Sequence, residues 1–307
     1  MLYIGVDFGG TKIEAAALST DGTFLSRQRE PNPGSYPAAI RLVRDLIARV
    51  EAEAKTKAPE LERVSATVGI GSPGSMSPRT GVMRNSNSTY LNGKPFRQDL
   101  ESALGRPIKL ANDANCLALS EAVDGAGAGA GSVFAIIVGT GCGGGLVVNG
   151  HLAEGANGIA GEWGHMSLPW PKPEEYPGPK CWCGLHGCLE TWVSGTGFAR
   201  DFVETTGRHM KGEDIIGAMR AGDRDAMAAF DRLLGRLGRS MASIVNILDP
   251  EVFVFGGGLS NVPEIYERLP GMIEPYVFSD SWQARLSAAR WGDSSGVRGA
   301  AYLWRDN

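Results

Sequence analysis

One local pattern occurs twice in this chain, and it limits the fold more than any other feature. Residues 2–18 hold an apolar β-forming run, the turn Asp-Phe-Gly-Gly-Thr-Lys at 7–12, and a second apolar run. Residues 133–148 repeat this arrangement, with a glycine-rich turn at 139–145. Apolar runs joined by a glycine turn are typical of β-hairpins. Because the two copies lie about half the chain apart, they predict two related domains.

Helical and strand-like segments alternate along the rest of the chain. Apolar residues at helical spacing predict helices over residues 36–55, 96–104, 117–123, 198–205, 214–219, 223–248, 262–272 and 295–304. Short apolar runs predict strands over residues 64–70, 107–110, 252–255 and 285–289. This alternation favours an α/β architecture, and 307 residues are enough for two domains of ordinary size.

Charge and apolar content argue against several classes of protein. The net charge is −4, and no run of lysines or arginines is present, which argues against nucleic-acid binding. No stretch approaches the ~20 apolar residues that cross a bilayer. Asp7 comes too early for the apolar region of a signal peptide. We therefore expect a cytoplasmic protein that binds neither nucleic acid nor a membrane.

The segment from 161 to 191 concentrates potential metal ligands. Three of the five cysteines, Cys181, Cys183 and Cys188, lie within eight residues, and His165 precedes them. Three thiolates and one imidazole form a ligand set of tetrahedral structural zinc sites. The spacing Cys-x-Cys-x₄-Cys is not that of a zinc finger, and three buried or free thiols are the alternative. The run of five prolines before Cys181 cannot form regular structure and needs something to hold it in place. A bound metal ion would do so, which favours zinc over free thiols.

Glycines follow a predicted strand at three places, and their backbone N–H groups could bind phosphate. The alternative is an ordinary tight turn, and neither a P-loop nor a GxGxxG motif is present. Asp7 would repel a triphosphate unless Mg²⁺ lay between them. Lys12 points either to the phosphates or to solvent. The predicted nucleotide-binding residues are Asp7, Gly9, Gly10, Thr11, Lys12, Gly139, Thr140, Gly141, Gly256, Gly257 and Gly258.

Asn112 and Asp113 follow the strand predicted at 107–110. The simplest interpretation is an N-cap for the next helix. The functional hypothesis is that Asp113 accepts a proton from a sugar hydroxyl while that hydroxyl attacks phosphorus, because phosphoryl transfer requires mainly alignment and one base. Polyol recognition needs fixed donors and acceptors. Candidates for that mixture are Asn87, Asn112, Glu162, His165 and Glu190.

Five motifs carry a resemblance to a known family. They are DFGGT at 7–11, Asn112-Asp113, Gly139-Thr140-Gly141, GEWGH at 161–165 and CWCGLHGCLE at 181–190. Together they resemble the ROK family of sugar kinases, from the first strand to the last helix. The resemblance implies an actin-like, hexokinase-type (ribonuclease H-like) α/β fold with a cleft between two domains. The first would contain residues 1–115 and the terminal helix (about 295–307), and the second residues 116–294 with a zinc-binding insertion.

The resemblance also implies a role for each candidate. Asp113 would be the catalytic base, and Mg²⁺-ATP the donor, with Gly256–Gly258 beside the adenosine. The sugar hydroxyls would be held by Glu162, His165, Glu190, Asn112 and Gly74 of the Pro73-Gly74 loop. Zinc would be bound by His165, Cys181, Cys183 and Cys188. One ring nitrogen of His165 would bind the metal and the other would face the sugar, so the metal would set its tautomer.

Within the family, residues 85–93 and 292–296 look most like bacterial fructokinases and mannokinases. The expected reaction is therefore phosphorylation of the 6-hydroxyl of fructose, or of mannose or glucose. An N-acetylglucosamine kinase of the same family is the alternative. A sugar-sensing repressor or non-catalytic protein is a second class, but the family's repressors carry an N-terminal helix-turn-helix for which a strand at Leu2 leaves no room. A homodimer is expected, and the aromatic residues near Tyr176, Trp182 and Trp192 serve either its interface or local packing.

Overall fold

The computed structural model describes residues 1–305 and divides into two compact units, which are treated separately. Unit 1 contains Met1–Gly131, Gly145–Gly161 and the segment that begins at Arg290. Unit 2 contains Ser132–Gly144 and Glu162–Ala289. The predicted domain boundary at residue 115 stays a prediction.

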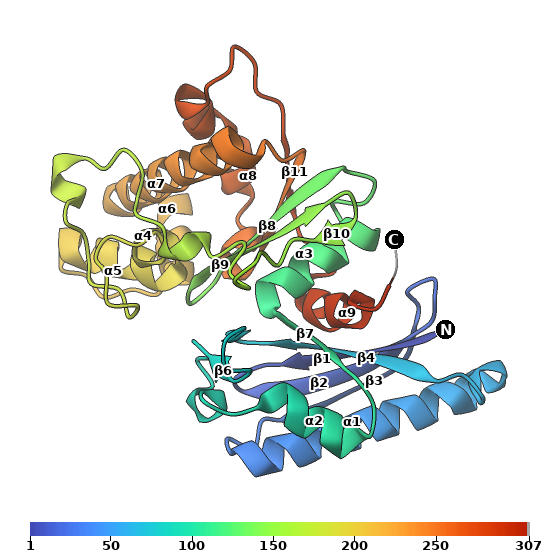
Figure 1. The fold of residues 1–307 in the computed structure, drawn as a ribbon. Helices are drawn as coiled ribbons and strands as arrows, with labels where there is room; N and C mark the ends of the chain where they lie inside the picture. Colours follow the sequence, from blue (N-terminus) through green and yellow to red (C-terminus); the bar gives the residue numbers. More distant parts are fainter. Residues whose placement is uncertain (306–307) are drawn as a thin grey trace. The chain divides into compact units, whose positions relative to one another are not determined.

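A five-stranded sheet of order β3-β2-β1-β4-β7 organises unit 1 (Figure 1). Its strands are β1 (Leu2–Phe8), β2 (Lys12–Leu18), β3 (Phe24–Pro31), β4 (Ala66–Ser72) and β7 (Lys109–Asn112). The first three pair antiparallel, whereas β1, β4 and β7 run parallel. The predicted hairpin over residues 2–18 is confirmed. Strand β3 was not predicted, because its mixture of charged and apolar residues lacks a continuous apolar run.

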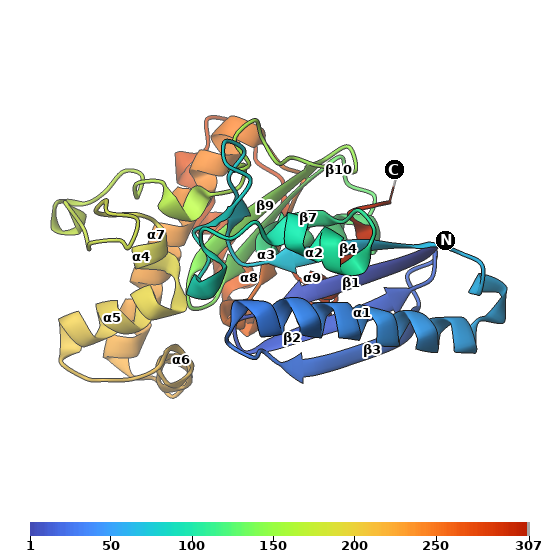
Figure 2. The ribbon, with the colours of Figure 1, turned by 60° about the horizontal axis from the view of Figure 1, so that its bottom comes forward.

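Two helices pack against this sheet. Helix α1 (Tyr36–Lys57) lies along β2 and β3 and buries Val43, Ile47 and Val50 (Figure 2). Helix α9 (Ser295–Tyr302) contacts β1 and β4. Its close approach depends on Gly5 and Gly69, where an added Cβ would lie 1.9 Å from the carbonyl oxygens of Val297 and Ala300. The chain therefore returns at its end to complete the core of unit 1.

The second sheet has the order β10-β9-β8-β11-β12. Its strands are β8 (Ser132–Val138), β9 (Cys142–Val148), β10 (His151–Leu152), β11 (Val252–Gly256) and β12 (Arg285–Ala288). Strands β8, β11 and β12 are parallel, and β9 and β10 are antiparallel. Both sheets thus place an early hairpin beside strands added in parallel, which agrees with the repeated sequence pattern. A further two-stranded ladder joins β5 (Ser75–Met76) to β6 (Met83–Arg84).

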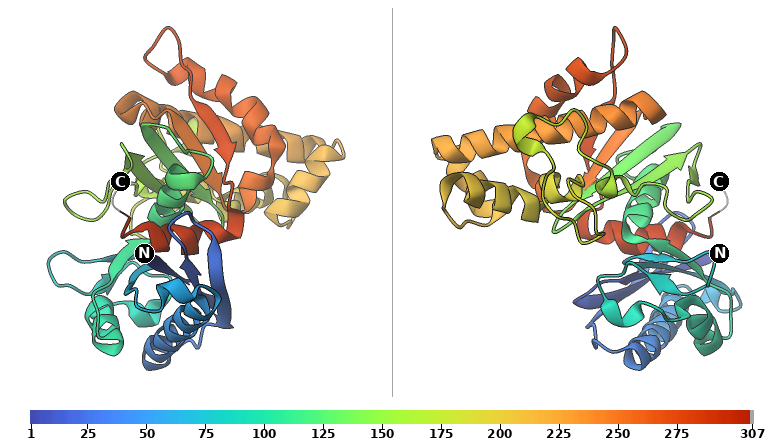
Figure 3. Two further views of the ribbon diagram at one scale, coloured as in Figure 1. Left: turned by 90° about the vertical axis from the view of Figure 1, so that its right-hand side faces the viewer. Right: turned by 60° about the vertical axis from the view of Figure 1, so that its left-hand side comes forward.

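Helices dominate the later part of unit 2 (Figure 3). They are α4 (Glu190–Val193), α5 (Gly195–Thr206), α6 (Gly212–Arg220), α7 (Arg224–Leu248) and α8 (Pro263–Ile273). Helix α7 packs against α5, α6 and α8. In unit 1, α2 (Phe96–Leu104) has its predicted bounds, and α3 (Asp113–Asp124) begins four residues earlier than predicted. Among residues 1–305 no helix is long and apolar enough to cross a membrane.

Candidate functional site

The first predicted phosphate turn connects β1 to β2 in unit 1. Asp7 lies near the end of β1, residues 9–11 form the turn, and Lys12 begins β2. Asn32 fixes the turn, since its side-chain amide donates to the Gly9 carbonyl at 2.7 Å and its backbone N–H to the Thr11 carbonyl at 2.9 Å. Burial, together with the negative charge of Asp113, raises the pKa of Asp7 to about 6. Two carboxylates that repel each other in this way favour a divalent cation nearby.

Asn112 and Asp113 have different local roles. The Asn112 side chain caps α3 by accepting a hydrogen bond from the Asn115 N–H at 2.7 Å, which confirms the N-cap interpretation for Asn112. Asp113 is the first residue of the helix and accepts from the Ala114 N–H at 2.9 Å. Its side chain is open to solvent, yet the surrounding protein atoms displace part of its hydration and raise its pKa. A carboxylate with a raised pKa is the better proton acceptor.

Gly74 and Asn87 lie on loops of the same unit. Ser72, at the end of β4, pairs with Asn112 in parallel register, so the loop with Gly74 leaves the sheet beside Asn112. Gly74 has a φ of +81°. Asn87 is exposed on the loop that follows β6. Unit 1 therefore carries Asp113 together with three of the predicted sugar-binding residues.

Two glycine turns lie side by side in unit 2. Strands β8 and β11 are parallel neighbours, with Gly256 paired to Ile137, so both turns follow the same edge of the sheet. An added Cβ on Gly257 would lie 2.5 Å from the Val138 carbonyl oxygen. The hydroxyl of Thr196, at the start of α5, donates to the Thr140 carbonyl at 2.7 Å. Thr196 was not among the predicted site residues, because Gly-Thr-Gly at the start of a helix has no functional signal of its own.

Glu162 precedes a short 3₁₀ turn, Trp163–His165, that ends at His165 and packs on β9. An added Cβ on Gly164 would lie 2.0 Å from the Cys142 carbonyl oxygen, so the turn touches the strand backbone. The Trp163 indole N–H donates to the Gly143 carbonyl at 3.0 Å. These contacts fix the backbone from which Glu162 and His165 project.

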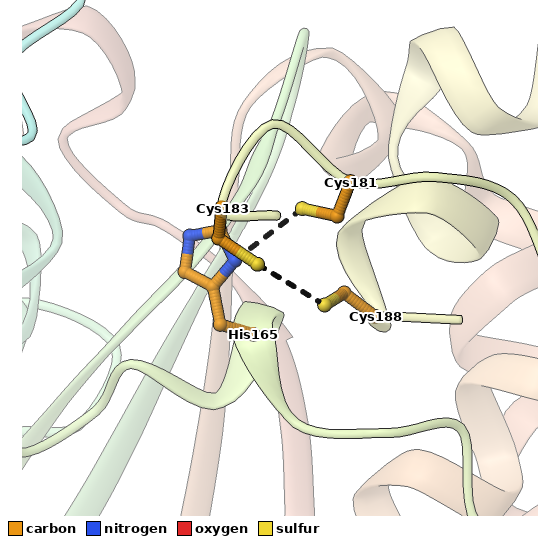
Figure 4. Close-up of side chains that lie close together, drawn as sticks. All are labelled: His165, Cys181, Cys183 and Cys188. Carbon is orange, nitrogen blue, oxygen red and sulfur yellow. Dashed lines mark hydrogen bonds between the residues drawn. The ribbon is translucent and has the colours of Figure 1, made fainter. Parts of the chain in front are cut away.

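His165 and the three cysteines of the 181–188 segment converge, as Figure 4 shows. Their ligand atoms all lie within 4.8 Å of one another. Cys181 Sγ lies 3.6 Å from His165 Nδ1, and Cys183 Sγ lies 3.6 Å from Cys188 Sγ. With zinc–ligand bonds of about 2.3 Å to sulfur and 2.0 Å to nitrogen, a tetrahedron separates two sulfurs by about 3.8 Å and sulfur from nitrogen by about 3.5 Å. The donor set and its spacing therefore fit a zinc ion.

Protonation of the cysteines would be coupled to metal binding at this cluster. Burial raises the pKa of the Cys181 thiol, and it raises that of Cys188 to about 12. Without a cation these two thiols are therefore neutral at physiological pH. Thiolates are the form that binds a metal, and a bound metal would in turn hold them deprotonated.

Glu190 connects this cluster to the glycine turn after β8. Its Oε2 accepts from the Cys142 N–H at 3.1 Å, and its Oε1 accepts from the Trp182 indole N–H at 2.7 Å. The Trp182 ring lies edge-on to the His165 ring, with 4.9 Å between centroids. Sequence reasoning selected Glu190 and His165 but missed the tryptophan that touches both. Its only signal was its position between two cysteines.

The proline-rich run has an anchor that the sequence analysis also missed. The carboxylate of Glu175 accepts from Arg236 and Arg239 of α7 at 2.9 Å, and Arg236 also donates to Asp201 of α5 at 2.7 Å. All four side chains are buried. The guanidinium of Arg236 lies over the Trp192 ring, 4.4 Å from its centroid, so Trp192 serves local packing. The sequence did contain a signal for this anchor. Two arginines fall on the apolar face of α7, and buried arginines require charged partners.

The predicted site residues are therefore divided between the units. Unit 1 contains Asp7–Lys12, Gly74, Asn87, Asn112 and Asp113. Unit 2 contains Gly139–Gly141, Gly256–Gly258, Glu162, Glu190 and the four metal-ligand candidates. Within each unit the structure brings its group together. That Asp113 and the residues of unit 2 act on one sugar stays a prediction.

Known proteins resemble the whole chain. It is 37% identical over 307 residues to an N-acetyl-D-glucosamine kinase of Pectobacterium atrosepticum, covering 98% of each chain. A ROK hexokinase structure from Thermus thermophilus has a TM-score of 0.85 at 34% identity, covering 98% of this chain and 97% of that one. A ROK family glucokinase from Streptomyces griseus, in complex with glucose and AMPPNP, has a TM-score of 0.75 at 29% identity over the full length of both chains.

These likenesses confirm the predicted fold class, the two-domain actin-like α/β fold of hexokinases. The ROK family profile matches residues 3–307. The motifs of both glycine turns and the cysteine segment lie inside that match. The chain belongs to the ROK family.

Proposed function

We propose that this protein is an ATP-dependent sugar kinase whose preferred substrate is N-acetylglucosamine, phosphorylated at its 6-hydroxyl. The relatives named N-acetyl-D-glucosamine kinase are 37–39% identical and cover nearly the full length of both chains. This support replaces fructose, the substrate expected from residues 85–93 and 292–296, with the alternative from the same family. Fructose, mannose and glucose remain substrates to be tested.

The catalytic proposal rests on the different roles of two neighbouring residues, Asn112 and Asp113, at the start of α3. Asn112 provides the N-cap, and the neighbouring carboxylate of Asp113, which accepts from the Ala114 N–H, is still exposed to solvent. In the proposed reaction the sugar oxygen forms a bond to the γ-phosphorus of ATP, and the bond from that phosphorus to the leaving ADP oxygen breaks. The hydroxyl proton passes to Asp113, whose raised pKa suits that role.

Nucleotide binding would use the glycine turns and the acid of the first hairpin. Backbone N–H groups of the turns at 9–11 and 139–141 are suited to phosphate oxygens. A Mg²⁺ ion would supply positive charge between the phosphates and Asp7. The raised pKa of Asp7 fits this assignment, because a nearby cation would relieve its repulsion from Asp113.

Zinc is proposed as a structural ion in the cluster of His165 and the three cysteines. When bound, it would supply a fixed point to which the 161–191 segment is tied. Nδ1 is the ring nitrogen that faces Cys181 Sγ. Nε2 would then be left to meet a sugar hydroxyl, and the metal would determine the tautomer.

The deciding experiment measures ADP release with ATP and N-acetylglucosamine, fructose, mannose or glucose. We expect the highest kcat/KM for N-acetylglucosamine, and sugar 6-phosphate as the product by mass spectrometry. A higher kcat/KM for fructose would restore the first expectation. Sugar binding by calorimetry without ADP release would instead favour a sensing protein. Sedimentation of the purified protein tests the expected homodimer.

A further inference from the structure

Trp182, in the proposed metal-binding segment, contacts two of the three sugar-site candidates of unit 2, His165 and Glu190. It lies between Cys181 and Cys183, its ring is edge-on to His165 at 4.9 Å, and its indole N–H donates to Glu190 at 2.7 Å. The segment therefore has a direct link to Glu190 that does not pass through a metal ligand.

The Glu190 carboxylate is held from two directions. Oε1 accepts from Trp182 and Oε2 from the Cys142 backbone N–H at 3.1 Å. An ionised carboxylate has about four lone-pair positions, so each oxygen keeps one for a further donor. Two fixed oxygens with one free position each match a pair of neighbouring sugar hydroxyls. A carboxylate held by the Cys142 N–H alone would be free to rotate. Its oxygens would then spend less time in the orientation that matches the two hydroxyls.

The exposure of Trp182 separates this role from a structural one. Its side chain is 64% exposed, whereas Trp192, ten residues later, is 6% exposed and packs under Arg236. A residue that buries so little surface contributes little to the core. Removing the indole N–H should therefore change the orientation of Glu190 without unfolding the segment.

We propose that Trp182 is a positioning residue for sugar binding: its indole N–H holds the Glu190 carboxylate in the orientation that accepts two sugar hydroxyls. This inference rests on the proposed function, because it takes Glu190 as a sugar ligand. It adds that the residue between the first two cysteines determines how well that ligand is aligned.

The test is Trp182→Phe, which keeps an aromatic ring on His165 but removes the N–H. We expect the KM for the sugar to rise about 3- to 10-fold, within the range of a typical net hydrogen-bond contribution, because the lost bond acts only through the alignment of Glu190. The kcat and the KM for ATP should stay within about two-fold. Zinc content and Tm should stay at the wild-type values. Trp170→Phe, at another exposed tryptophan of unit 2, is the control and should leave the sugar KM unchanged.

A double-mutant cycle identifies the partner. In a Glu190→Gln background, Trp182→Phe should add less than about a two-fold change, because its effect acts through the carboxylate. Equal effects in both backgrounds would overturn the proposal. If Trp182→Phe loses zinc, site-specific replacement of Trp182 by 3-benzothienylalanine changes only the N–H to sulfur, and a wild-type sugar KM in that variant would also overturn it.

The two proposals fail differently. Wild-type protein without ADP release or sugar binding would overturn the proposed function and, with it, the role of Trp182. An active wild type whose sugar KM is unaffected by Trp182→Phe would overturn only the positioning role.

Discussion

Both oxygens of the Glu175 carboxylate accept hydrogen bonds from Arg239 at 2.9 Å, 64 residues along the chain. Arg236 donates to the same carboxylate at 2.9 Å. This buried group of charges ties the proline-rich run before the cysteines to α7. The proposed metal ion would therefore be one of two anchors of the segment, and the other is built from side chains alone.

Replacing Glu175 should destabilise the protein, because two buried arginines would lose the negative charge that they face. Glu175→Gln is expected to lower the free energy of unfolding at pH 7 by about 3 kcal/mol. Burial by itself would raise the pKa of Glu175, but hydrogen bonds from Lys172, Arg236 and Arg239 outweigh it and lower the pKa below 4.5. The difference from wild type should therefore shrink as the pH falls below 4.5.

Calorimetric unfolding as a function of pH measures this difference. Arg220→Met, which removes an exposed ion pair to Glu264, is the control and should leave Tm almost unchanged. Equal losses from both variants would contradict a special role for the buried group.

Asp7→Asn should stabilise the protein in the absence of ligands. The folded-state pKa of Asp7, about 6, lies above its ordinary value of 3.8. Between these values the native state binds protons that the unfolded chain has released, so native stability falls as the pH rises from 3.8 to 6. At pH 7 the variant should gain about 1–2 kcal/mol after allowance for solvent screening, and the gain should disappear near pH 4.

Chemical denaturation at pH 4 and 7 provides the comparison. The same variant should lose the stabilisation that Mg²⁺-ATP gives the wild type, seen as a smaller shift of Tm. A Tm shift equal to that of wild type would remove Asp7 from the nucleotide site.

Gly257 and Gly258 separate backbone packing from nucleotide binding. Gly257 has a φ of +82°, and an added Cβ would lie 2.5 Å from the Val138 carbonyl oxygen. Gly258 has open space at its Cβ position. Gly257→Ala should therefore lower Tm and impair activity generally. Gly258→Ala should keep Tm but raise the KM for ATP, because the methyl group would occupy space assigned to adenosine. Unchanged ATP kinetics in Gly258→Ala would refute that assignment.

Loss of a cysteine ligand should affect both metal content and the sugar site. Cys183→Ala is expected to bind less than one zinc per chain, lower Tm and raise the sugar KM, since the cluster orients His165. His186→Gln, at a histidine of the same segment outside the ligand set, should retain full zinc. Elemental analysis and thermal unfolding report on both variants, and metal-free wild type with full activity would be the contrary result.

Asp113→Asn tests the proposed base. The amide cannot accept the hydroxyl proton, so kcat should fall by at least about 10²-fold, while calorimetric affinity for the sugar stays within a few-fold. Asp45→Asn, at an exposed carboxylate on α1, is the matched control. A catalytically competent Asp113→Asn protein would assign the base elsewhere.

The sequence predicted most helices and strands within a few residues, because their apolar periodicity is strong. It failed where the pattern was polar. Strand β3, at the edge of its sheet, continues after Phe24 and Leu25 with five polar or charged residues. Apolar periodicity also placed the start of α3 at residue 117, although the N-cap interpretation of Asn112 located its observed start. The candidate site residues were found because glycine turns, cysteine spacing and acid–amide pairs are local motifs.

The sequence by itself determined the two strand–glycine–strand units, the four metal-ligand candidates and the family, since these depend on residue types at short spacing. Only the tertiary structure decided which residues hold those motifs in place. Trp182 on Glu190, Thr196 on Thr140, and Arg236 and Arg239 on Glu175 are such contacts. Their partners are separated by 8 to 64 residues. Local periodicity carries no information about such pairs, because their energy comes from groups that become neighbours only after the chain has folded.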